Sequence, residues 1–327
     1  MHQLAINAAV PRLRRLARTA VLLLAVPLQA VAAEPVSAES LLARVQSAAH
    51  QLDYAGTFMY QLGSNLVASH IVHQATPDGG RERIEVLDGP KQREFVRENK
   101  VVYSLLPERQ LVLVEARETD HFPGMITGNP QHLDALYQVD LLDEPGRVAG
   151  RPCRNATVVP RDVWRWGYRM CIDDASGLLL KVQTLDADGA ILEQAAFSEI
   201  TVGDTFDPDW LESSHPWREW PRVQGGREFD LAAAGWHISA PEGFQPISQI
   251  KRKLKGRAQV HQMVLTDGLA AISVFIEPYD PSLGQSDSMT AYGATSIYRG
   301  RKGEHWLTVL GEVPPRTVQA VADAIAR

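Results

Sequence analysis

The segment Tyr54-Ala-Gly-Thr-Phe-Met-Tyr-Gln-Leu62 opens the β-rich part of the chain, and its aromatic and β-prone residues predict a strand. Residues 67–73 form a second β-prone run, which ends before the turn residues Thr76-Pro-Asp-Gly-Gly80. Charged and apolar residues alternate through residues 81–87, which predicts a strand with one solvent-facing and one buried face. Further short strands are expected at residues 93–96, 101–106 and 110–114.

Helical patterns flank these strands. Ser37-Ala-Glu-Ser40 has the composition of a helix start, and apolar residues at helical spacing follow it. Residues 130–137 predict a short helix with a proline in its first turn. Four more strands are expected at residues 147–159, 165–173, 177–186 and 190–200. The order of elements predicts an α+β fold, in which a curved antiparallel sheet closes around helices.

The composition changes at residues 205–226, where prolines, glycines and three tryptophans predict an interdomain linker that packs against another part of the protein. Strands at residues 235–239, 260–266, 270–277, 291–298 and 305–310 and a helix at residues 314–327 predict a smaller second domain. The expected division is a leader at 1–33, a large domain at 34–204, a linker at 205–226 and a small domain at 227–327.

The leader has the pattern of a secretory signal peptide. Four arginines, Arg12, Arg14, Arg15 and Arg18, precede the apolar run of residues 20–28, and Ala30-Val-Ala-Ala33 supplies small residues for cleavage. A transmembrane helix needs about 20 apolar residues, so an uncleaved anchor is the less favoured alternative. The sequence therefore predicts an exported, soluble mature chain.

The mature chain is acidic. The sequence has 33 basic and 39 acidic residues, and loss of the four leader arginines leaves 29 basic residues and a formal charge of about −10. Nucleic-acid-binding proteins have basic surfaces, so nucleic acid is not expected as a partner.

The chain has only two cysteines, Cys153 and Cys171. An even pair in an exported protein predicts one disulfide, while two buried free thiols remain the alternative. Neither a cluster of Cys and His at metal-ligand spacing nor a nucleophile, zinc-protease or nucleotide-binding motif occurs in the sequence. Neither an enzyme nor a metal or other cofactor is therefore predicted.

Two features are candidates for binding. The first is a set of large apolar residues in the early strands, which would line a groove for a lipid chain or a hydrophobic peptide, or would simply form the core. The groove candidates are Phe58, Tyr60, Leu87, Phe95, Val102, Leu111 and Leu113. The second is the basic run 251–257, which would bind phosphates or an acidic partner, or would be a solvated strand edge. Its candidates are Lys251, Arg252, Lys253, Lys255 and Arg257.

Four segments together resemble the MucB/RseB family. They are Tyr54-Ala-Gly-Thr-Phe58, Asp173-Asp-Ala-Ser-Gly-Leu-Leu-Leu-Lys181 with Phe197 after it, Leu265-Thr-Asp-Gly-Leu-Ala-Ala-Ile-Ser-Val-Phe-Ile-Glu277 and Val309-Leu-Gly-Glu-Val-Pro314. The likeness extends over essentially the whole mature chain and its domain order. These segments are family patterns rather than catalytic motifs, so their joint occurrence carries the resemblance.

The resemblance implies a periplasmic negative regulator of a sigma-E type envelope-stress response. Such a protein would bind the periplasmic domain of a membrane anti-sigma factor, similar to MucA or RseA, and would protect it from regulated proteolysis. Mislocalised lipid or lipopolysaccharide would be the signal that releases it. The implied large domain is an unclosed β-barrel around helices, similar to LolA and LolB, and a periplasmic lipid or lipoprotein carrier is therefore the alternative function. The sequence leaves a homo-oligomer open.

Overall fold

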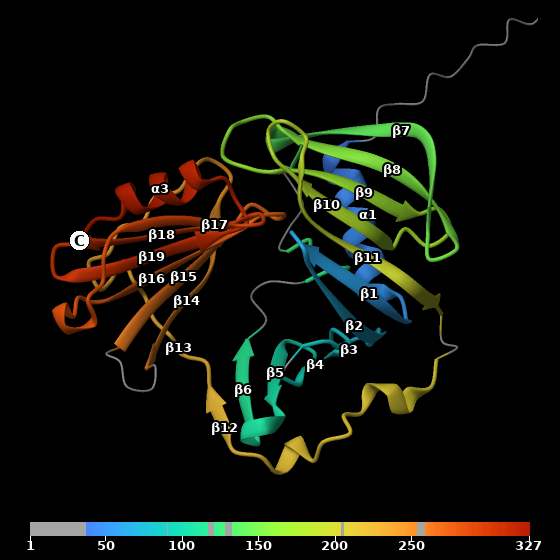
Figure 1. The fold of residues 1–327 in the computed structure, drawn as a ribbon, viewed down its shortest axis with the longest axis horizontal. Helices are drawn as coiled ribbons and strands as arrows, with labels where there is room; N and C mark the ends of the chain where they lie inside the picture. The colour runs from blue at the N-terminus through green and yellow to red at the C-terminus, as the bar shows by residue number, and fades with distance from the viewer. Residues whose placement is uncertain (1–36, 90, 117–120, 128–132, 204–205, 254–258) are drawn as a thin grey trace, which may run out of the picture. The chain divides into compact units, whose positions relative to one another are not determined.

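The computed structural model describes residues 37–89, 91–116, 121–127, 133–203, 206–253 and 259–327. The predicted signal peptide lies outside the described residues. From Val36 to Arg327 the chain forms one compact unit, which contains two β-sheets (Figure 1). The predicted α+β class is confirmed.

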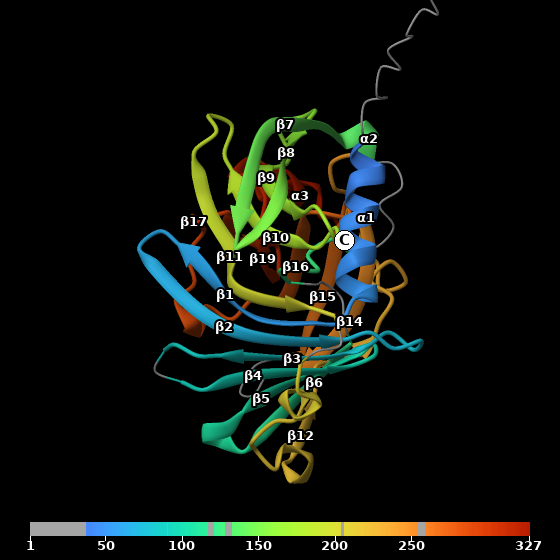
Figure 2. The same ribbon diagram turned by 90° about the vertical axis from the view of Figure 1, so that its right-hand side faces the viewer.

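In the described part of the chain, twelve strands form a large sheet in the order β12-β6-β5-β4-β3-β2-β1-β11-β10-β9-β8-β7. Neighbouring strands run antiparallel, apart from the parallel pair β12 and β6. The edge strands β12 and β7 do not pair, so the sheet is not closed; Figure 2 shows it twisting from β7 towards β6. The bounds are β1 Tyr54–Leu62, β2 Asn65–Gln74, β3 Arg81–Val86, β4 Arg93–Glu98, β5 Val101–Leu106, β6 Leu111–Ala116, β7 Tyr137–Val148, β8 Arg151–Pro160, β9 Gly167–Asp173, β10 Leu179–Leu185, β11 Ile191–Val202 and β12 Arg222–Gln224.

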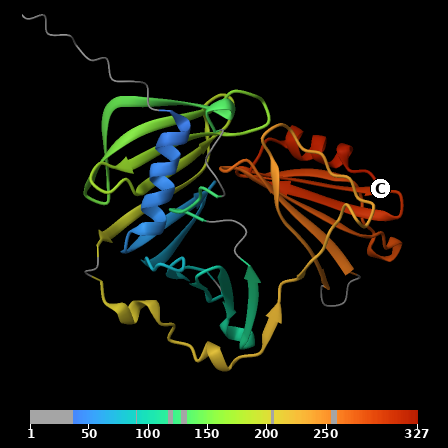
Figure 3. The same ribbon diagram turned by 180° about the vertical axis from the view of Figure 1, so that it is seen from behind.

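Helix α1 (Ala38–Gln51) covers part of the concave face of this sheet (Figure 3). It begins at Ser37, whose hydroxyl oxygen accepts a hydrogen bond from the Ser40 amide and thereby caps the first turn. Leu42 and Val45 are fully buried among residues of β1 and β8–β11. The spacing of these apolar residues therefore places one side of the helix in the core of the large sheet.

Strand β7 differs from the prediction of a helix at 130–137 and one strand at 147–159. The described helix α2 is only Leu133–Leu136, and β7 follows it and pairs with β8 through a turn at 149–150. The register shifts between Leu141 and Pro145. An edge strand tolerates the acidic residues and the proline that hid β7 in the sequence, because its outer side needs no partner strand.

The predicted linker packs against the convex face of the large sheet. It contains the short helices η2 (Pro208–Leu211) and η3 (Trp217–Glu219), and it also supplies strand β12. Trp217 and Trp220 are buried with apolar residues of β4–β6, whereas Trp210 stays 46% exposed. The connecting segment is therefore part of the large sheet and its second core.

In the described residues of the C-terminal part, seven strands form a small sheet in the order β13-β14-β15-β16-β19-β18-β17. Helix α3 (Pro315–Ala324) buries Val318 and Val321 against one face of this sheet. The bounds are β13 Arg227–Glu228, β14 Gln245–Lys253, β15 Gln259–Thr266, β16 Ala271–Pro278, β17 Ser288–Tyr292, β18 Thr295–Lys302 and β19 His305–Gly311; the remaining short helices are η1 Pro107–Arg109 and η4 Pro281–Leu283.

Two strand predictions for this part were wrong, and one strand was missed. Residues 235–239 follow a turn at 231–235 and make one bridge, from His237 to Ala326, rather than a strand. The expected strand 291–298 is two strands, because Gly293 adopts a positive φ of 60° and reverses the chain between β17 and β18. Strand β14 was not predicted, since its charged residues conceal its alternation.

Candidate functional site

A cavity of about 700 Å³ lies between the concave face of β3–β6 and the face of the small sheet that α3 does not cover. We call it the inter-sheet pocket. Its apolar walls include Ile84, Phe95 and Val102 from the large sheet and Ile250 and Val264 from the small sheet. Ile84 lies opposite Phe95 in adjacent strands, so both side chains point to the same face. The pocket is of the size and character that a ligand site has in proteins.

Charges of both signs accompany these apolar walls. Arg252 Nη1 lies 3.6 Å from Glu115 Oε1, and the Arg252 guanidinium carbon lies 5.4 Å from the centre of the Phe275 ring. Arg97 lies 3.4 Å from Glu82 and also donates to the Gly79 carbonyl oxygen. The pocket therefore offers apolar area together with hydrogen-bonding groups, which suits an amphipathic ligand better than a purely apolar one.

The groove candidates separate into two groups. Phe95 and Val102 line the pocket, and Leu111 and Leu113 share their face of the sheet but lie outside the pocket walls. Phe58 and Tyr60 do not line it. The Phe58 ring is buried against Phe122 and Phe197, as the core alternative expected. The Tyr60 hydroxyl donates to Glu193, and Leu87 is 50% exposed.

The basic run does not form one patch. Lys251 and Arg252 are consecutive residues of β14, and successive side chains of a strand point to opposite faces. Lys251 Nζ lies 4.8 Å from the Phe229 ring centre, whereas Arg252 borders the inter-sheet pocket and a second cavity of about 560 Å³. Lys253 ends β14, and Lys255 and Arg257 lie outside the described residues. Arg252 is thus the member of the run that the structure places at a cavity.

The β15–β16 turn, residues 266–270, joins the small sheet to the large one. Asp267 Oδ2 accepts hydrogen bonds from the Tyr137 hydroxyl at 2.8 Å and from Arg165 Nε at 2.6 Å. Its Oδ1 accepts from the amides of Leu269 and Ala270, which fixes the turn. The Leu269 side chain is buried in the core of the large sheet. We call residues 266–270 the Asp267 turn.

The partner of the Asp267 turn is a buried arginine. Arg165 also donates to the Asp162 carboxylate and the Glu242 carbonyl oxygen, and its guanidinium carbon lies 4.7 Å from the Phe244 ring centre. Burial raises the pKa of the Tyr137 hydroxyl, and the nearby Asp267 carboxylate raises it further. Tyr137 therefore stays protonated and remains a hydrogen-bond donor to Asp267.

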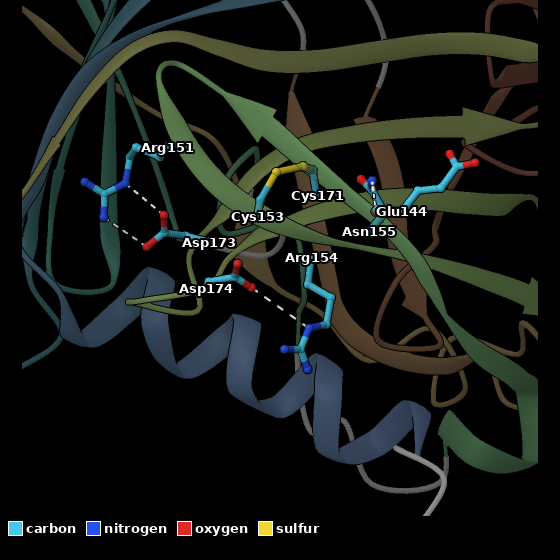
Figure 4. Close-up of a disulfide and its surroundings, with 8 residues drawn as sticks. All are labelled: Glu144, Arg151, Cys153, Arg154, Asn155, Cys171, Asp173 and Asp174. Atoms are coloured by element: carbon cyan, nitrogen blue, oxygen red, sulfur yellow. Dashed lines mark hydrogen bonds and ion pairs between the residues drawn. A yellow bond between two sulfur atoms is a disulfide. The ribbon is translucent and has the colours of Figure 1, made fainter. Parts of the chain in front are cut away.

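The disulfide lies between β8 and β9 (Figure 4). Cys153 and Cys171 are bonded, with Cα atoms 5.5 Å apart. Gly146 of β7 lies directly against it, because a Cβ atom there would approach the Cys171 sulfur to 2.7 Å. Nearby, Arg151 donates two hydrogen bonds to Asp173, at 2.8 and 3.0 Å. Burial alone would raise the pKa of Asp173, but hydrogen bonds from Arg151 and Ser176 outweigh it and lower the pKa.

The Arg165–Asp267–Tyr137 cluster was not predicted from the sequence. Asp267 stands in a Thr-Asp-Gly turn, and Arg165 lies between two tryptophans, Trp164 and Trp166. A carboxylate in a tight turn and an arginine flanked by large aromatic residues are the local features that could have drawn attention to them. The pairing itself joins residues 102 positions apart, which no local pattern can specify.

No cluster of three or more His, Cys, Asp or Glu residues in the described part of the chain is arranged to hold a metal ion. Its helices are also too short or too polar to cross a membrane.

The chain matches one protein family along most of its length. Residues 37–215 match the MucB/RseB N-terminal domain, and residues 230–326 match the MucB/RseB C-terminal domain. It is 31% identical over 318 residues to the "Sigma factor AlgU regulatory protein MucB" of Pseudomonas aeruginosa, which covers 94% of this chain and 96% of the relative. It is 25% identical over 299 residues to the "Sigma-E factor regulatory protein RseB" of Haemophilus influenzae, which covers 90% and 92%.

Solved structures give the same result. The complex structure of Pseudomonas aeruginosa MucA/MucB superposes with a TM-score of 0.69 at 28% identity, over 88% of this chain and 98% of that chain. A crystal structure of MucB in complex with MucA(peri) gives 0.68 at 28% identity, over 89% and 98%. The resemblance inferred from the sequence is confirmed, and both curated relatives are named as regulatory proteins, not enzymes.

Proposed function

Because the chain belongs to the MucB/RseB family, we propose that it regulates a sigma-E type factor by binding the periplasmic domain of a membrane anti-sigma factor. The observation that supports this most is the similarity, over nearly the whole chain, to MucB in complex with MucA(peri). The predicted leader fits export to the periplasm, where such a domain would be accessible.

We place the partner in the inter-sheet pocket. A polypeptide segment can bury apolar side chains against Phe95 and Val102 while its polar groups meet Arg252 and Glu115. Burial of apolar surface contributes roughly 25 cal/mol per Å², so a few side chains suffice for appreciable affinity. A segment held between two sheets would also be shielded from a protease, which is how the complex would protect the anti-sigma factor.

Binding of the purified anti-sigma periplasmic domain to the mature chain tests this proposal by calorimetry. Val102→Asp puts a charge on the apolar wall and is expected to weaken binding at least about tenfold, or 1.4 kcal/mol. Leu87→Asp is the matched control, because Leu87 is exposed and outside the pocket. The absence of wild-type binding at micromolar concentration would refute the function. Equal affinity of the two variants would refute only the pocket.

The salt dependence of binding tests the charged wall separately. Arg252→Ala is expected to reduce the dependence of affinity on salt concentration, because Arg252 borders the pocket. Lys251→Ala should leave it unchanged, since Lys251 is on the opposite face of β14. Equal effects of the two changes would assign the basic run to general surface charge.

Lipid sensing is the second part of the proposal. The apolar walls of the pocket would accept acyl chains, each buried CH₂ contributing about 0.8 kcal/mol, so lipid and anti-sigma factor would compete for one surface. Lipopolysaccharide that is added to the complex before the crosslinker should lower the yield of crosslinks. Unchanged crosslinks would remove the sensing role. Stoichiometric lipid in the purified protein, with transfer between membranes, would instead favour the lipid carrier.

A further inference from the structure

A buried carboxylate holds the β17–β18 turn against the large sheet. Glu193 on β11 is 7% exposed, and its Oε2 accepts hydrogen bonds from the Ala294 amide at 3.2 Å and the Tyr60 hydroxyl at 3.1 Å. Trp166 Nε1 donates to the Ala294 carbonyl oxygen at 2.8 Å. Both backbone groups of Ala294, which is itself fully buried, are therefore bound by side chains, one on β11 and one just before β9.

Among the described residues, the groups that bind or act on Glu193 bring no positive charge to it. Tyr60 approaches from β1 and Ala294 from the turn, and the Glu312 carboxylate, which follows β19, repels it. Tyr168 of β9 and Tyr292 at the end of β17 also border this contact. Tyr168 carries a buried hydroxyl without a hydrogen-bond partner in the described residues.

Arg165, a cation in this region of the described chain, is already engaged. It acts electrostatically on Tyr168 and is bound by Asp162 and Asp267. None of the ion pairs in the described chain involves Glu193. An ionised carboxylate that is buried without a cation is costly, and a second carboxylate nearby increases that cost.

We propose that Glu193 forms a pH-sensitive latch between β11 and the β17–β18 turn, which protonation tightens. A protonated Glu193 keeps an oxygen that accepts the Ala294 amide, but it removes the buried charge and the repulsion from Glu312. The latch goes beyond the proposed function, since it requires no partner. The stability of this contact between the two sheets that form the inter-sheet pocket would then depend on pH.

The direction of the pH dependence follows from the two acids. Burial raises the pKa of Glu193, although the hydrogen bonds from Ala294 and Tyr60 act in the opposite direction. Burial of the carboxylate and repulsion from Glu193 raise the pKa of Glu312 to about 7, but Glu312 is an exposed residue, so solvent weakens both effects. Glu193 is 7% exposed and binds the turn directly, so it has the larger role. An acid with a raised pKa in the folded state stabilises the contact below its unfolded pKa, and this contribution is lost as pH rises through the folded pKa.

Hydrogen exchange of the β17–β18 turn tests the latch in the mature chain. Exchange of residues 288–298 is followed by mass spectrometry from pH 5.5 to 8.5 and corrected for the intrinsic exchange rate. Protection in the wild type should fall as the pH rises, by up to roughly tenfold per pH unit for one proton. Glu193→Gln, whose amide oxygen still accepts the Ala294 amide, should keep the turn protected at every pH.

Two further variants make the test decisive. Glu199→Gln is the matched control on the same strand, because Glu199 is exposed and accepts a hydrogen bond from Thr57; its profile should equal that of the wild type. Glu312→Gln removes the repulsion and should move the wild-type transition to lower pH, which tests the latch even where Glu193→Gln does not fold. A wild-type profile without pH dependence, or a Glu193→Gln profile equal to the wild type, would overturn the proposal.

Discussion

Removal of the Asp267 carboxylate should destabilise the protein far more than removal of an exposed acid. Both side chains of the Arg165–Asp267 pair are fully buried. Asp267→Ala leaves a buried guanidinium with one carboxylate fewer and the buried Tyr137 hydroxyl without its acceptor. Loss of one partner of a buried pair typically costs 3–5 kcal/mol. Asp162 and the Glu242 carbonyl still bind Arg165, so we expect the lower end, about 3 kcal/mol.

Urea denaturation followed by far-UV circular dichroism measures this free energy of unfolding, with tryptophan fluorescence as a second probe of two-state behaviour. Asp174→Ala is the matched control, because the Arg154–Asp174 pair is exposed and 3.9 Å long; it should cost less than about 1 kcal/mol. In the double variant with Arg165→Ala, the cost should be smaller than the sum of the single costs, by roughly 1–3 kcal/mol. A cost of Asp267→Ala within 1 kcal/mol of that of Asp174→Ala would refute the reasoning.

Three further predictions concern other parts of the large sheet. Gly146→Ala should destabilise the oxidised protein by roughly 1–3 kcal/mol, because its Cβ would meet both sulfurs of the disulfide. The cost should be smaller in a variant with alanine at both cysteines, where the Asn155 side chain is the close neighbour that remains; equal costs in both would contradict this contact. Trp217→Ala should cost about 3–5 kcal/mol in urea denaturation, whereas Trp210→Ala on the exposed side should cost clearly less; a reversed order would contradict the packing of the connecting segment. Asp173 has a lowered pKa in the folded protein. Its contribution to the free energy of unfolding is therefore present above the unfolded pKa and is lost as pH falls through the folded pKa. Asp173→Asn should therefore reduce the loss of unfolding free energy at acidic pH. An unchanged loss would refute the contribution of Asp173 to stability.

Local patterns were sufficient for those elements whose own residues determine them. Helix α1 was predictable from its start signal and apolar spacing, and β1 to β6 from alternation and turn residues. Strands β7 and β14 were missed, because β7 is an edge strand with acidic residues and a proline, and β14 carries the basic run. In both, a neighbouring strand, rather than local propensity, decides the conformation.

The candidate site was only partly predictable for a related reason. Phe95 and Val102 were named from the apolar character of β4 and β5, which is a local property. Phe58 is equally apolar but lies in the core. Apolar character alone does not distinguish a residue that packs in the core from one that lines a pocket. The opposite wall of the pocket and the Arg165–Asp267 pair come from segments far apart in the chain, so only the tertiary structure brings them together.

The parallel strand β12 has a consequence for any attempt to divide this protein. A fragment that ends near residue 204, where the sequence predicts the end of the large domain, would lack the strand that covers the outer edge of β6. It would also lose Trp217 and Trp220 and expose apolar side chains of β4–β6. Unpaired edges and exposed apolar faces promote association between chains, so such a fragment would aggregate or dimerise through β6. A soluble large half should extend at least to Gln224, so that it includes β12 and the tryptophans of the connecting segment.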